Sequence, residues 1–571
     1  MLEDKETYLM KTNDQLAEGE YELAKGKERT ILGRLHRKLM NQLKYMGIED
    51  FKEQRKLCVT GPVMASMVLL IKVHKKNFPG RAYVSQIDDP SYKICKELTD
   101  ILNPLDMNGE SYIKDTYHFK ETIRNVDIIE GDRMGTLDVV GMFPNVPVKK
   151  TLEITREKLM KDESLSERTE WSVDDIMKLL EISIETYFKT IDGKIYRQTD
   201  GLPIGKSISK PLAGIYMHWF EENYVFKQEN KEKLVYWKRE MDDIFFVWRG
   251  TKDELENFVW QLNGVEFKIN FTLNHEEENF IPFLDVGITK KDGKLITKVY
   301  RKPTHTQQYI NWKSNHPKNL LLGVMKGLIH RAHMLCDEKE DLLQELSLLR
   351  DVFIANGYPY KLVIETLEKS WEKETLRAML VGVEQEIIPE NAKEYYDVLH
   401  APYVRGFSEG LQRKLKKYNV GYVPKKGETL YTKLCRLKQK TEMMDQKDVI
   451  YAVECDTCGV LYVGETGQHF CDRSRQHQAD VRAGKSSNGI YDHLKRNEKH
   501  SINWQKVIFL DKEKNWRGRK IKEAIYINAL NTGETMDPTR VMNLEKGFKI
   551  DPIWAEFNPV FRNQVRERIG K

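Results

Sequence analysis

The stretch Trp237–Trp248, WKREMDDIFFVW, decides the fold, because it holds two adjacent acids between two apolar runs. The aromatic and β-branched residues predict short buried strands over Val235–Trp237 and Ile244–Trp248. Asp242 and Asp243 then lie at the turn, where neighbouring carboxylates repel each other unless a cation holds them together. Mg²⁺ takes hard oxygen ligands and leaves positions open for substrate phosphates. An isolated acidic pair is more often a solvated turn, so a metal site requires a further ligand.

A third aspartate lies upstream, in Met134–Val148, MGTLDVVGMFPNVPV. Asp138 belongs to a strand-like run, and Phe143 follows five positions later. A carboxylate on a strand beside the hairpin would complete a two-metal site, in which the ions activate a 3′-hydroxyl and stabilise a leaving pyrophosphate. Phe143 would then wall off the 2′ position of the sugar and favour deoxynucleotides. We therefore predict that two Mg²⁺ ions bind to Asp138, Asp242 and Asp243.

Two further segments supply candidate substrate contacts. Gln198–Met217, QTDGLPIGKSISKPLAGIYM, is a glycine-rich loop followed by a helix with small residues, which suits close approach by a base pair. The resemblance to reverse transcriptases, whose motifs are set out below, implies that Gln198 and Gly201 contact the templating pair. Lys72 and Arg81 flank a turn, and the same resemblance implies that they hold the incoming triphosphate, the arginine by bidentate contact. An ordinary exposed basic hairpin is the alternative for this pair.

The order strand–Asp–x4–Phe, then GLPxG, then x-DD resembles the palm of a reverse transcriptase, and it resembles the Penelope-like retroelement polymerases most closely. The resemblance covers roughly Gly61 to Cys336. It implies a right-hand polymerase with fingers, palm and helical thumb, an RNA template, deoxynucleoside triphosphates and a nuclear location. Four segments outside the aspartate motifs also match: Ile71–Ser85 (IKVHKKNFPGRAYVS), Phe280–Asp285 (FIPFLD), Lys298–Tyr309 (KVYRKPTHTQQY) and Ser314–Pro317 (SNHP).

Two lysines near these motifs are left without a firm role. Lys206 follows Gly205 where the family more usually has Gly-Ser, and we assign it no function. Lys268 is the candidate for the lysine that protonates the pyrophosphate.

A second constellation occupies Val449–His477, VIYAVECDTCGVLYVGETGQHFCDRSRQH. Tyr451 and Tyr462 each lie in a strand-like run, and Arg473 and His477 follow four apart, on one face of a helix. An Arg–x3–His pair alone is usually a solvated helix face. With both tyrosines in order, the arrangement resembles the GIY-YIG endonucleases, although valine stands where that family often has glycine.

The resemblance implies a metal-dependent DNA endonuclease with one Mg²⁺. In that family a tyrosine helps to activate water, an arginine supports the phosphate and a glutamate holds the metal. Glu523, in KEAIYI, is the candidate metal ligand, with Asn543 a further match. One metal neutralises the scissile phosphate while the arginine supplies the charge that a second metal would otherwise give. The other catalytic residues carried over are Tyr451, Tyr462, Arg473 and His477.

A C-x2-C knuckle lies inside the same segment. Cys455 and Cys458 form half of a structural zinc site, and His493 and His500 could complete a tetrahedron. The spacing between the histidines is longer than in ordinary fingers. Nuclease domains of the Penelope-like group carry a similar CCHH insertion, which implies a structural Zn²⁺ here. Cys471 is either an alternative ligand or a packed thiol.

Helical periodicity marks three regions. Residues 1–58 predict a helical lead-in that braces the fingers or binds template RNA. Ser172–Tyr187 reads as a helix capped by Ser172, and Leu320–Trp371 has the charged helical texture of a thumb. The leucines that recur at helical spacing in the lead-in are Leu32, Leu35, Leu39 and Leu43.

Charge is concentrated in one stretch. Ala401–Lys440 holds eleven Lys and Arg against two Glu, whereas the whole chain has a net charge of +5. A basic stretch interleaved with tyrosines suits phosphate contacts with some stacking, or it is a solvated linker. The turn formers indicate a loosely structured connector: Gly406, Gly410, Gly421, Pro424 and Gly427.

Length and composition set the outer limits. A chain of 571 residues is too long for one core, and its charged fraction of 31% suits a globular protein. The longest apolar run, Val63–Ile71, is too short to cross a bilayer, and the start, MLEDKETY, lacks the layout of a signal peptide. Seven cysteines are too few for a disulfide framework, which favours a reducing compartment. We expect a multidomain α/β protein divided into a helical extension (1–60), reverse-transcriptase fingers and palm (61–319), a helical thumb (320–400), a basic linker (401–446) and a small α+β GIY-YIG endonuclease domain (447–571).

The sequence thus predicts an RNA-directed DNA polymerase fused to a nuclease that nicks target DNA, so that the exposed 3′-hydroxyl primes copying of the RNA. Two other interpretations stay open. One is a polymerase adapted to telomere or repair work, with a decayed nuclease. The other is an RNA-binding scaffold without enzymatic activity.

Overall fold

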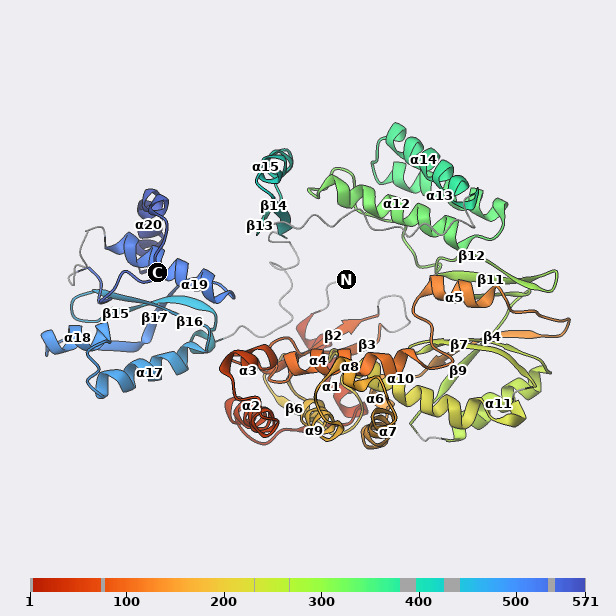
Figure 1. The fold of residues 1–571 in the computed structure, drawn as a ribbon, viewed down its shortest axis with the longest axis horizontal. Coiled ribbons are helices and arrows are strands. Elements are labelled where there is room, and N and C mark those ends of the chain that lie inside the picture. The colour runs from red at the N-terminus through yellow and green to blue at the C-terminus, as the bar shows by residue number, and fades with distance from the viewer. Residues whose placement is uncertain are drawn as a thin grey trace.

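The computed structural model describes residues 4–72, 78–230, 232–265, 268–379, 397–425, 442–531 and 540–569. Their strands form five sheets. Figure 1 shows a central sheet and the helices α12 to α14 toward one end of the molecule, and a separate sheet with its own helices at the other end.

The central sheet contains the aspartate hairpin. Its four antiparallel strands lie in the order β7-β8-β4-β9. β7 and β8 are the predicted hairpin strands, and Glu240 pairs with Asp243, which leaves Met241 and Asp242 as the turn. The bounds are β4 (Arg133–Val139), β7 (Leu234–Glu240), β8 (Asp243–Trp248) and β9 (Phe271–His275).

Strand β8 is apolar and buried from Ile244 to Trp248 because both faces of the central sheet are covered there. Phe246 packs on one face, where its ring stacks on Trp237 in the core that includes helix α10. Phe245 points to the other face, where it contacts Phe119 and Phe283 in a second core. Alternate residues of one strand therefore join two hydrophobic cores and fix its register.

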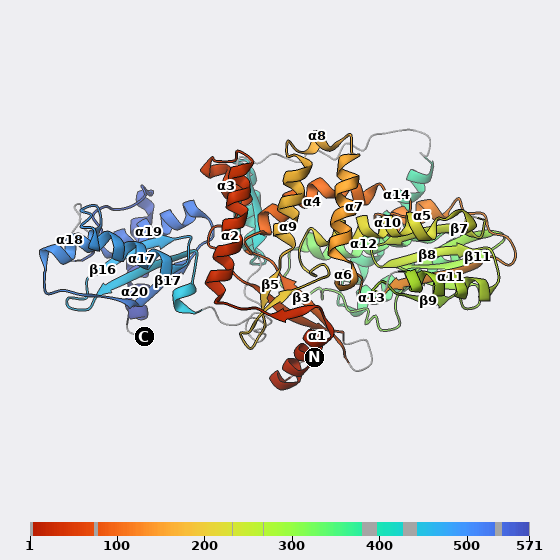
Figure 2. The ribbon, with the colours of Figure 1, turned by 90° about the horizontal axis from the view of Figure 1, so that it is seen from below.

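A layer of helices supports the first face, and Figure 2 shows α4, α7 and α9 side by side between the two ends of the molecule. Ser172 caps α9 by accepting from the Asp175 N–H, as predicted, but the helix ends at Ile184 because Tyr187 opens the next strand. The helices are α4 (Tyr92–Met107), α5 (Thr116–Ile123), α6 (Met142–Asn145), α7 (Val148–Met160), α8 (Leu165–Arg168), α9 (Val173–Ile184), α10 (Ser209–Phe220) and α11 (Lys252–Val265).

The N-terminal region packs against this layer. Helix α2 contacts α9, and the four leucines predicted from periodicity are buried on it. A mixed sheet in the order β1-β6-β5-β2-β3 lies beside it. The elements are α1 (Lys5–Glu18), β1 (Tyr21–Leu23), α2 (Glu28–Tyr45), α3 (Phe51–Leu57), β2 (Ala65–Ile71), β3 (Gly80–Ser85), β5 (Tyr187–Lys189) and β6 (Ile195–Gln198).

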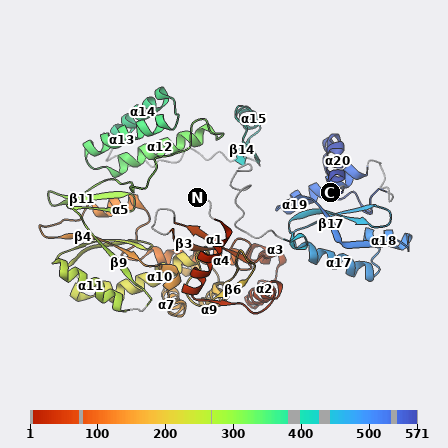
Figure 3. The ribbon, with the colours of Figure 1, turned by 180° about the vertical axis from the view of Figure 1, so that it is seen from behind.

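A small sheet and three helices follow the central sheet, and Figures 1 and 3 show these helices on the opposite side of the molecule from the C-terminal unit. Buried Lys120 on α5 pairs with Asp337 at 2.9 Å, which ties the helices to the core. The prediction of helices over Leu320–Trp371 is confirmed. The bounds are β10 (Phe280–Phe283), β11 (Val286–Lys291), β12 (Lys294–Val299), α12 (Lys318–Leu335), α13 (Lys339–Ala355) and α14 (Tyr360–Met379).

The prediction of a loosely structured connector is wrong for residues 397–425. They form a strand–helix–strand unit in which β13 (Asp397–Pro402) and β14 (Val420–Lys425) are parallel and α15 (Phe407–Lys416) connects them. Gly406 and Asn419 lie at element ends and have φ of +85° and +56°, whereas Gly410 lies inside α15 and Gly421 lies inside β14. The expected boundary at residue 401 falls within β13. Residues 426–441, with Tyr431, lie outside the described residues.

The C-terminal unit is a three-stranded antiparallel sheet in the order β16-β15-β17, covered by helices. It contacts the N-terminal region through Lys447, whose ammonium lies 3.1 Å from the Asp88 carboxylate. Its elements are β15 (Val449–Cys455), β16 (Leu461–Thr466), α17 (Phe470–Arg482), α18 (Gly489–Arg496), β17 (Ile502–Lys512), α19 (Trp516–Leu530) and α20 (Asn558–Ile569). Within the described residues, every helix is too short or too polar to cross a bilayer.

Candidate functional site

Two of the three predicted aspartates meet across the central sheet. Asp138 and Asp243 are direct partners in the register of β4 and β8. Side chains of such partners lie on the same face, with Cβ atoms about 4.5–5.5 Å apart. The Val139 N–H donates to the Asp242 carbonyl at 2.9 Å, which holds the turn against the end of β4. Asp138 and Asp243 line a cavity of about 650 Å³.

The electrostatics of this cluster favour a cation. Burial, together with the neighbouring charges of Asp242 and Asp138, raises the pKa of Asp243 to about 6. The carboxylate oxygens of the three aspartates do not all lie within 4.8 Å of one another. The donor set itself, three carboxylates beside an open cavity, fits Mg²⁺.

A lysine that the sequence argument did not single out lies on the same cavity. Lys302 lines it, and its charge opposes the rise in the pKa of Asp243. Its only sequence signal was its place in the KVYRKPTHTQQY segment. Lys268 is instead engaged in ion pairs with Asp200 at 2.9 Å and Glu20 at 3.0 Å, and these raise its pKa.

The glycine-rich loop is fixed against the turn that contains Phe143. The Leu202 N–H donates to the Phe143 carbonyl at 2.7 Å. Gly201 has a φ of +75°, and a Cβ there would lie 2.2 Å from the Pro144 carbonyl oxygen, so only glycine fits. Gln198, at the end of β6, donates to the Asp200 carbonyl at 3.1 Å and braces the same loop. The structure thus brings together Phe143, Gln198 and Gly201.

The other end of this loop reaches the hairpin of Lys72 and Arg81. The Val84 N–H on β3 donates to the Ile204 carbonyl at 2.8 Å. Arg81 is exposed on β3, and Lys72 closes the hairpin through its N–H, which donates to Pro79 at 2.9 Å. Residues 73–77 lie outside the described residues. Lys206, left without a role, is buried and its ammonium donates to the Ser183 carbonyl near the end of α9, so its role is structural.

The second constellation comes together inside the C-terminal unit. The Tyr451 hydroxyl, on β15, lies 2.7 Å from His477 Nε2, and Arg473 Nε donates to the same hydroxyl at 3.3 Å. The Tyr462 ring lies edge-on to the His477 ring at 5.1 Å. Burial, and then the charge of Arg473, lower the pKa of His477 to about 4, so this imidazole is neutral at neutral pH.

Glu523, on α19, lies beside this cluster. It accepts from the Glu465 N–H at 3.1 Å and from Lys520 at 3.0 Å, and burial raises its pKa. A metal at Glu523 would take the place that the Lys520 ammonium now holds. Asn543 has a different role, because its amide bonds both the N–H and the carbonyl of Val463 and extends the edge of the sheet.

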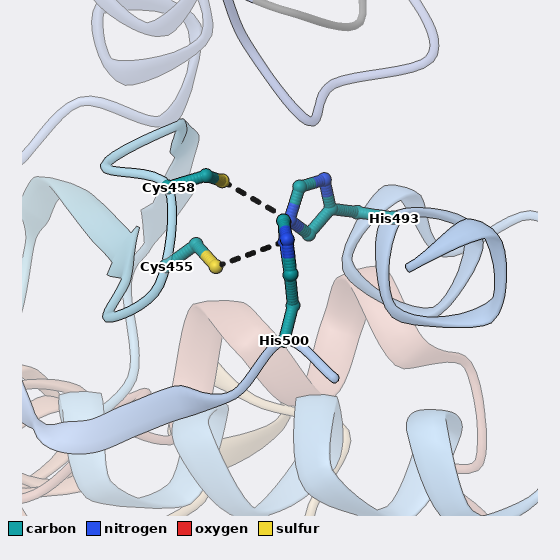
Figure 4. A group of neighbouring side chains, drawn as sticks. All are labelled: Cys455, Cys458, His493 and His500. Carbon is teal, nitrogen blue, oxygen red and sulfur yellow. Dashed lines mark hydrogen bonds between the residues drawn. The ribbon is translucent and has the colours of Figure 1, made fainter. Parts of the chain in front are cut away.

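The two cysteines and two histidines converge, as Figure 4 shows. Their four ligand atoms lie within 4.8 Å of one another. Cys455 Sγ lies 3.6 Å from His500 Nδ1, Cys458 Sγ lies 3.6 Å from His493 Nε2, and the two nitrogens are 3.2 Å apart. Ordinary zinc bond lengths in a tetrahedron put sulfur and nitrogen about 3.5 Å apart and two nitrogens about 3.3 Å apart. This group could therefore hold a zinc ion, and Cys471 is not part of it.

Comparisons with known proteins describe the fold. A model of the animal helix-turn-helix domain matches residues 308–367, which include α12 and α13. No curated protein matches the chain. A telomerase structure from Candida albicans, in complex with a telomeric RNA fragment, shares 11% identity at a TM-score of 0.43 and covers 63% of this chain and 59% of its own.

Other solved structures give a similar picture. A telomerase from Candida tropicalis, also with a telomeric RNA fragment, matches at 14% identity and a TM-score of 0.34, covering 59% of this chain and 58% of its own. The BmCPV RNA-dependent RNA polymerase at its elongation state matches at 12% identity and a TM-score of 0.34. The match covers 61% of this chain and 31% of that polymerase. The chain spans less than two thirds of each of these proteins.

Proposed function

We propose that this chain is an RNA-directed DNA polymerase of the Penelope-like kind, whose C-terminal unit is a GIY-YIG endonuclease. The nuclease nicks target DNA in the nucleus, and the 3′-hydroxyl at the nick primes copying of an RNA template. The observation that carries the polymerase half is the pairing of Asp138 with Asp243 beside the Asp242 turn.

The polymerase residues act mainly by positioning. Two Mg²⁺ ions, when bound, supply the charge that lowers the barrier to attack by the 3′-hydroxyl. Asp138, Asp242 and Asp243 would hold these ions. Phe143, fixed by the glycine-rich loop, contacts the sugar of the incoming nucleotide. Lys302 faces the same cavity and is suited to neutralise a phosphate there.

The nuclease residues have three roles: a proton acceptor, a positive charge at the phosphate and a metal ligand. His477 is neutral, and its Nε2 contacts the Tyr451 hydroxyl, so this pair can relay a proton from the attacking water. Arg473 would support the scissile phosphate, and Glu523 would hold one Mg²⁺. A zinc ion in the Cys2His2 group would join the β15–β16 turn to α18 and stabilise the unit.

The testing experiment mixes the purified chain with an RNA template, unprimed duplex DNA and deoxynucleotides in Mg²⁺. We expect RNA-copied DNA joined to a nicked strand. Asp242→Ala should abolish copying and keep nicking, and Glu523→Ala should do the reverse when copying is assayed on a primed template. Joint loss of both activities in each variant would contradict separate sites.

A second candidate is a polymerase whose C-terminal unit binds DNA without cutting it. It is favoured by two observations: Tyr451 is fully buried, and Glu523 is already paired with Lys520. Plasmid nicking in Mg²⁺ decides between the two. Intact supercoiled plasmid after long incubation, with primer extension retained, would favour this candidate.

A further inference from the structure

A buried polar cluster lies directly behind the aspartate turn, and none of the roles described above uses it. Arg239, Glu221 and His218 have exposed fractions of only 3%, 1% and 2%. Charged groups are almost never buried this deeply unless they are paired. The cluster joins strand β7 to the end of helix α10, underneath Asp242 and Asp243.

The guanidinium of Arg239 contacts three residues. Its Nε donates to Glu221 Oε1 at 2.7 Å, and its Nη2 lies 3.2 Å from His218 Nδ1. Its Nη1 donates to the carbonyl of Met241 at 3.3 Å. Because the guanidinium is planar and its donors form a rigid fork, two fixed contacts orient the third. Arg239 therefore transmits the position of α10 to the residue that precedes Asp242.

The partners of Arg239 are themselves fixed. Trp237 Nε1 donates to Glu221 at 3.1 Å, and His218 Nε2 lies 2.5 Å from the Asp106 carbonyl oxygen. That oxygen only accepts, so Nε2 carries the hydrogen and Nδ1 is left to accept from Arg239. Burial opposes ionisation of Glu221, but the charge of Arg239 lowers its pKa to about 2.

The surrounding backbone leaves room for the cluster. A Cβ on Gly109 would lie 1.8 Å from the His218 ring, and a Cβ on Gly214 would lie 1.7 Å from the Asp106 carboxylate. Glu221 also opens a π-helical turn, Glu221–Val225, directly after α10. Such π-helical turns are rare in proteins, and those that occur are often found at functional sites.

The turn itself needs support from outside. Met241 has a φ of +57°, which is uncommon for a residue with a side chain. Residues in such conformations persist where the surroundings over-determine them, and they cluster at active sites. Buried ion pairs can often be replaced by apolar residues with no loss of stability, so stability alone does not explain this cluster.

We infer that Arg239, held by Glu221 and His218, is a positioning residue that fixes the Met241 carbonyl and thereby the direction in which Asp242 and Asp243 present their carboxylates to divalent cations. The inference rests on the proposed polymerase function. It predicts that loss of the cluster weakens metal binding at the turn without unfolding the sheet.

The test is the double variant Arg239→Met with Glu221→Met, which removes both charges together and leaves apolar chains of similar length. The matched control is Asp132→Asn with Arg249→Met, which removes an ion pair of 2.8 Å at the opposite end of β4 and β8. Two quantities are measured on the full chain: the Mg²⁺ concentration for half-maximal primer extension, and Mn²⁺ binding without nucleic acid.

We expect the double variant to need about tenfold more Mg²⁺ and to bind Mn²⁺ about tenfold more weakly, the effect of losing one oriented hydrogen bond at the site. Its nicking activity and the metal response of the control should not change. If the double variant fails to fold, Arg239→Lys, which keeps the charge but loses the fork, should shift the Mg²⁺ requirement in the same direction.

Two outcomes overturn the inference: an unchanged metal response in a folded variant, or a lower unfolding temperature with an unchanged metal response. A different outcome separates it from the proposed function. If the wild-type chain extends no primer, but Mn²⁺ binding is lost in Asp242→Asn and weakened in the double variant, the polymerase proposal fails and the positioning role stands.

Discussion

Asp138 on β4 and Asp243 on β8 are direct partners across the central sheet, although a layer of helices separates them along the chain. Strand pairing of this kind fixes both backbones, so the distance between the two carboxylates varies only through side-chain rotation. The site is therefore built into the register of the sheet.

The raised pKa of Asp243 predicts a pH-dependent metal requirement. With a pKa of about 6, the carboxyl is partly protonated at pH 6 and must lose its proton to bind Mg²⁺. At limiting Mg²⁺, primer extension should rise as the pH increases through about 6, and saturating Mg²⁺ should move the midpoint to lower pH. A midpoint that does not depend on Mg²⁺ would contradict this prediction.

The same shift has a consequence for stability. Because the folded pKa of Asp243 lies above its unfolded value of 3.8, the folded state binds more protons between about pH 4 and pH 6. This group therefore contributes stability at low pH that is lost as the pH rises through that window. In metal-free buffer, Asp243→Asn should unfold at a higher temperature than the wild type at pH 7 and at a similar temperature at pH 4.

Zinc should stabilise the C-terminal unit alone. Cys455→Ser should lower the zinc content, measured by mass spectrometry, from one atom per chain to none, and should lower the unfolding temperature and abolish nicking. Primer extension should persist, because the central sheet lies outside this unit. Cys471→Ser is the matched control and should keep its zinc; loss of zinc from that variant instead would assign Cys471 as a ligand.

The Tyr451–His477 contact should matter for cleavage beyond its effect on stability. Tyr451→Phe leaves a buried imidazole nitrogen without its partner, which costs about 1–3 kcal/mol of unfolding free energy. It should also lower nicking about 10²-fold. Tyr526→Phe removes another buried phenol, which donates to the Leu510 carbonyl at 3.1 Å, and should lower stability with nicking unchanged. Equal nicking by the two variants would make Tyr451 structural.

Replacement by alanine should change the unfolding free energy in opposite directions at two glycines. Gly201→Ala places a residue with a side chain in the left-handed region of φ, which costs roughly 1–2 kcal/mol of unfolding free energy. It also brings the new Cβ against the Pro144 carbonyl. We expect a larger loss of unfolding free energy than this, together with loss of primer extension. In Gly33→Ala, in α2, the new Cβ meets no atom within 4 Å, so the substitution should raise the unfolding free energy by up to about 1 kcal/mol. Denaturant titration of both variants measures the difference.

Short-range patterns were enough to predict the strands around Asp242 and Asp243 and the buried leucines of α2, because each follows the period of its element. The small unit at residues 397–425 does not follow from these patterns, because its glycines and proline indicate breaks, whereas Gly410 lies inside α15 and Gly421 and Pro424 lie inside β14. Tertiary contacts explain the rest. Lys206 is buried under α9, and Arg239 is directed at Met241 by Glu221, which no local pattern reveals.

The most direct test of the central claim is primer extension by Asp138→Asn on a primed RNA template, with plasmid nicking measured on the same preparation. The account predicts that extension falls by about 10²–10³-fold, since one ligand of the metal pair is lost, while nicking is unchanged. Wild-type extension by Asp138→Asn would contradict the claim that the three aspartates together hold the catalytic cations.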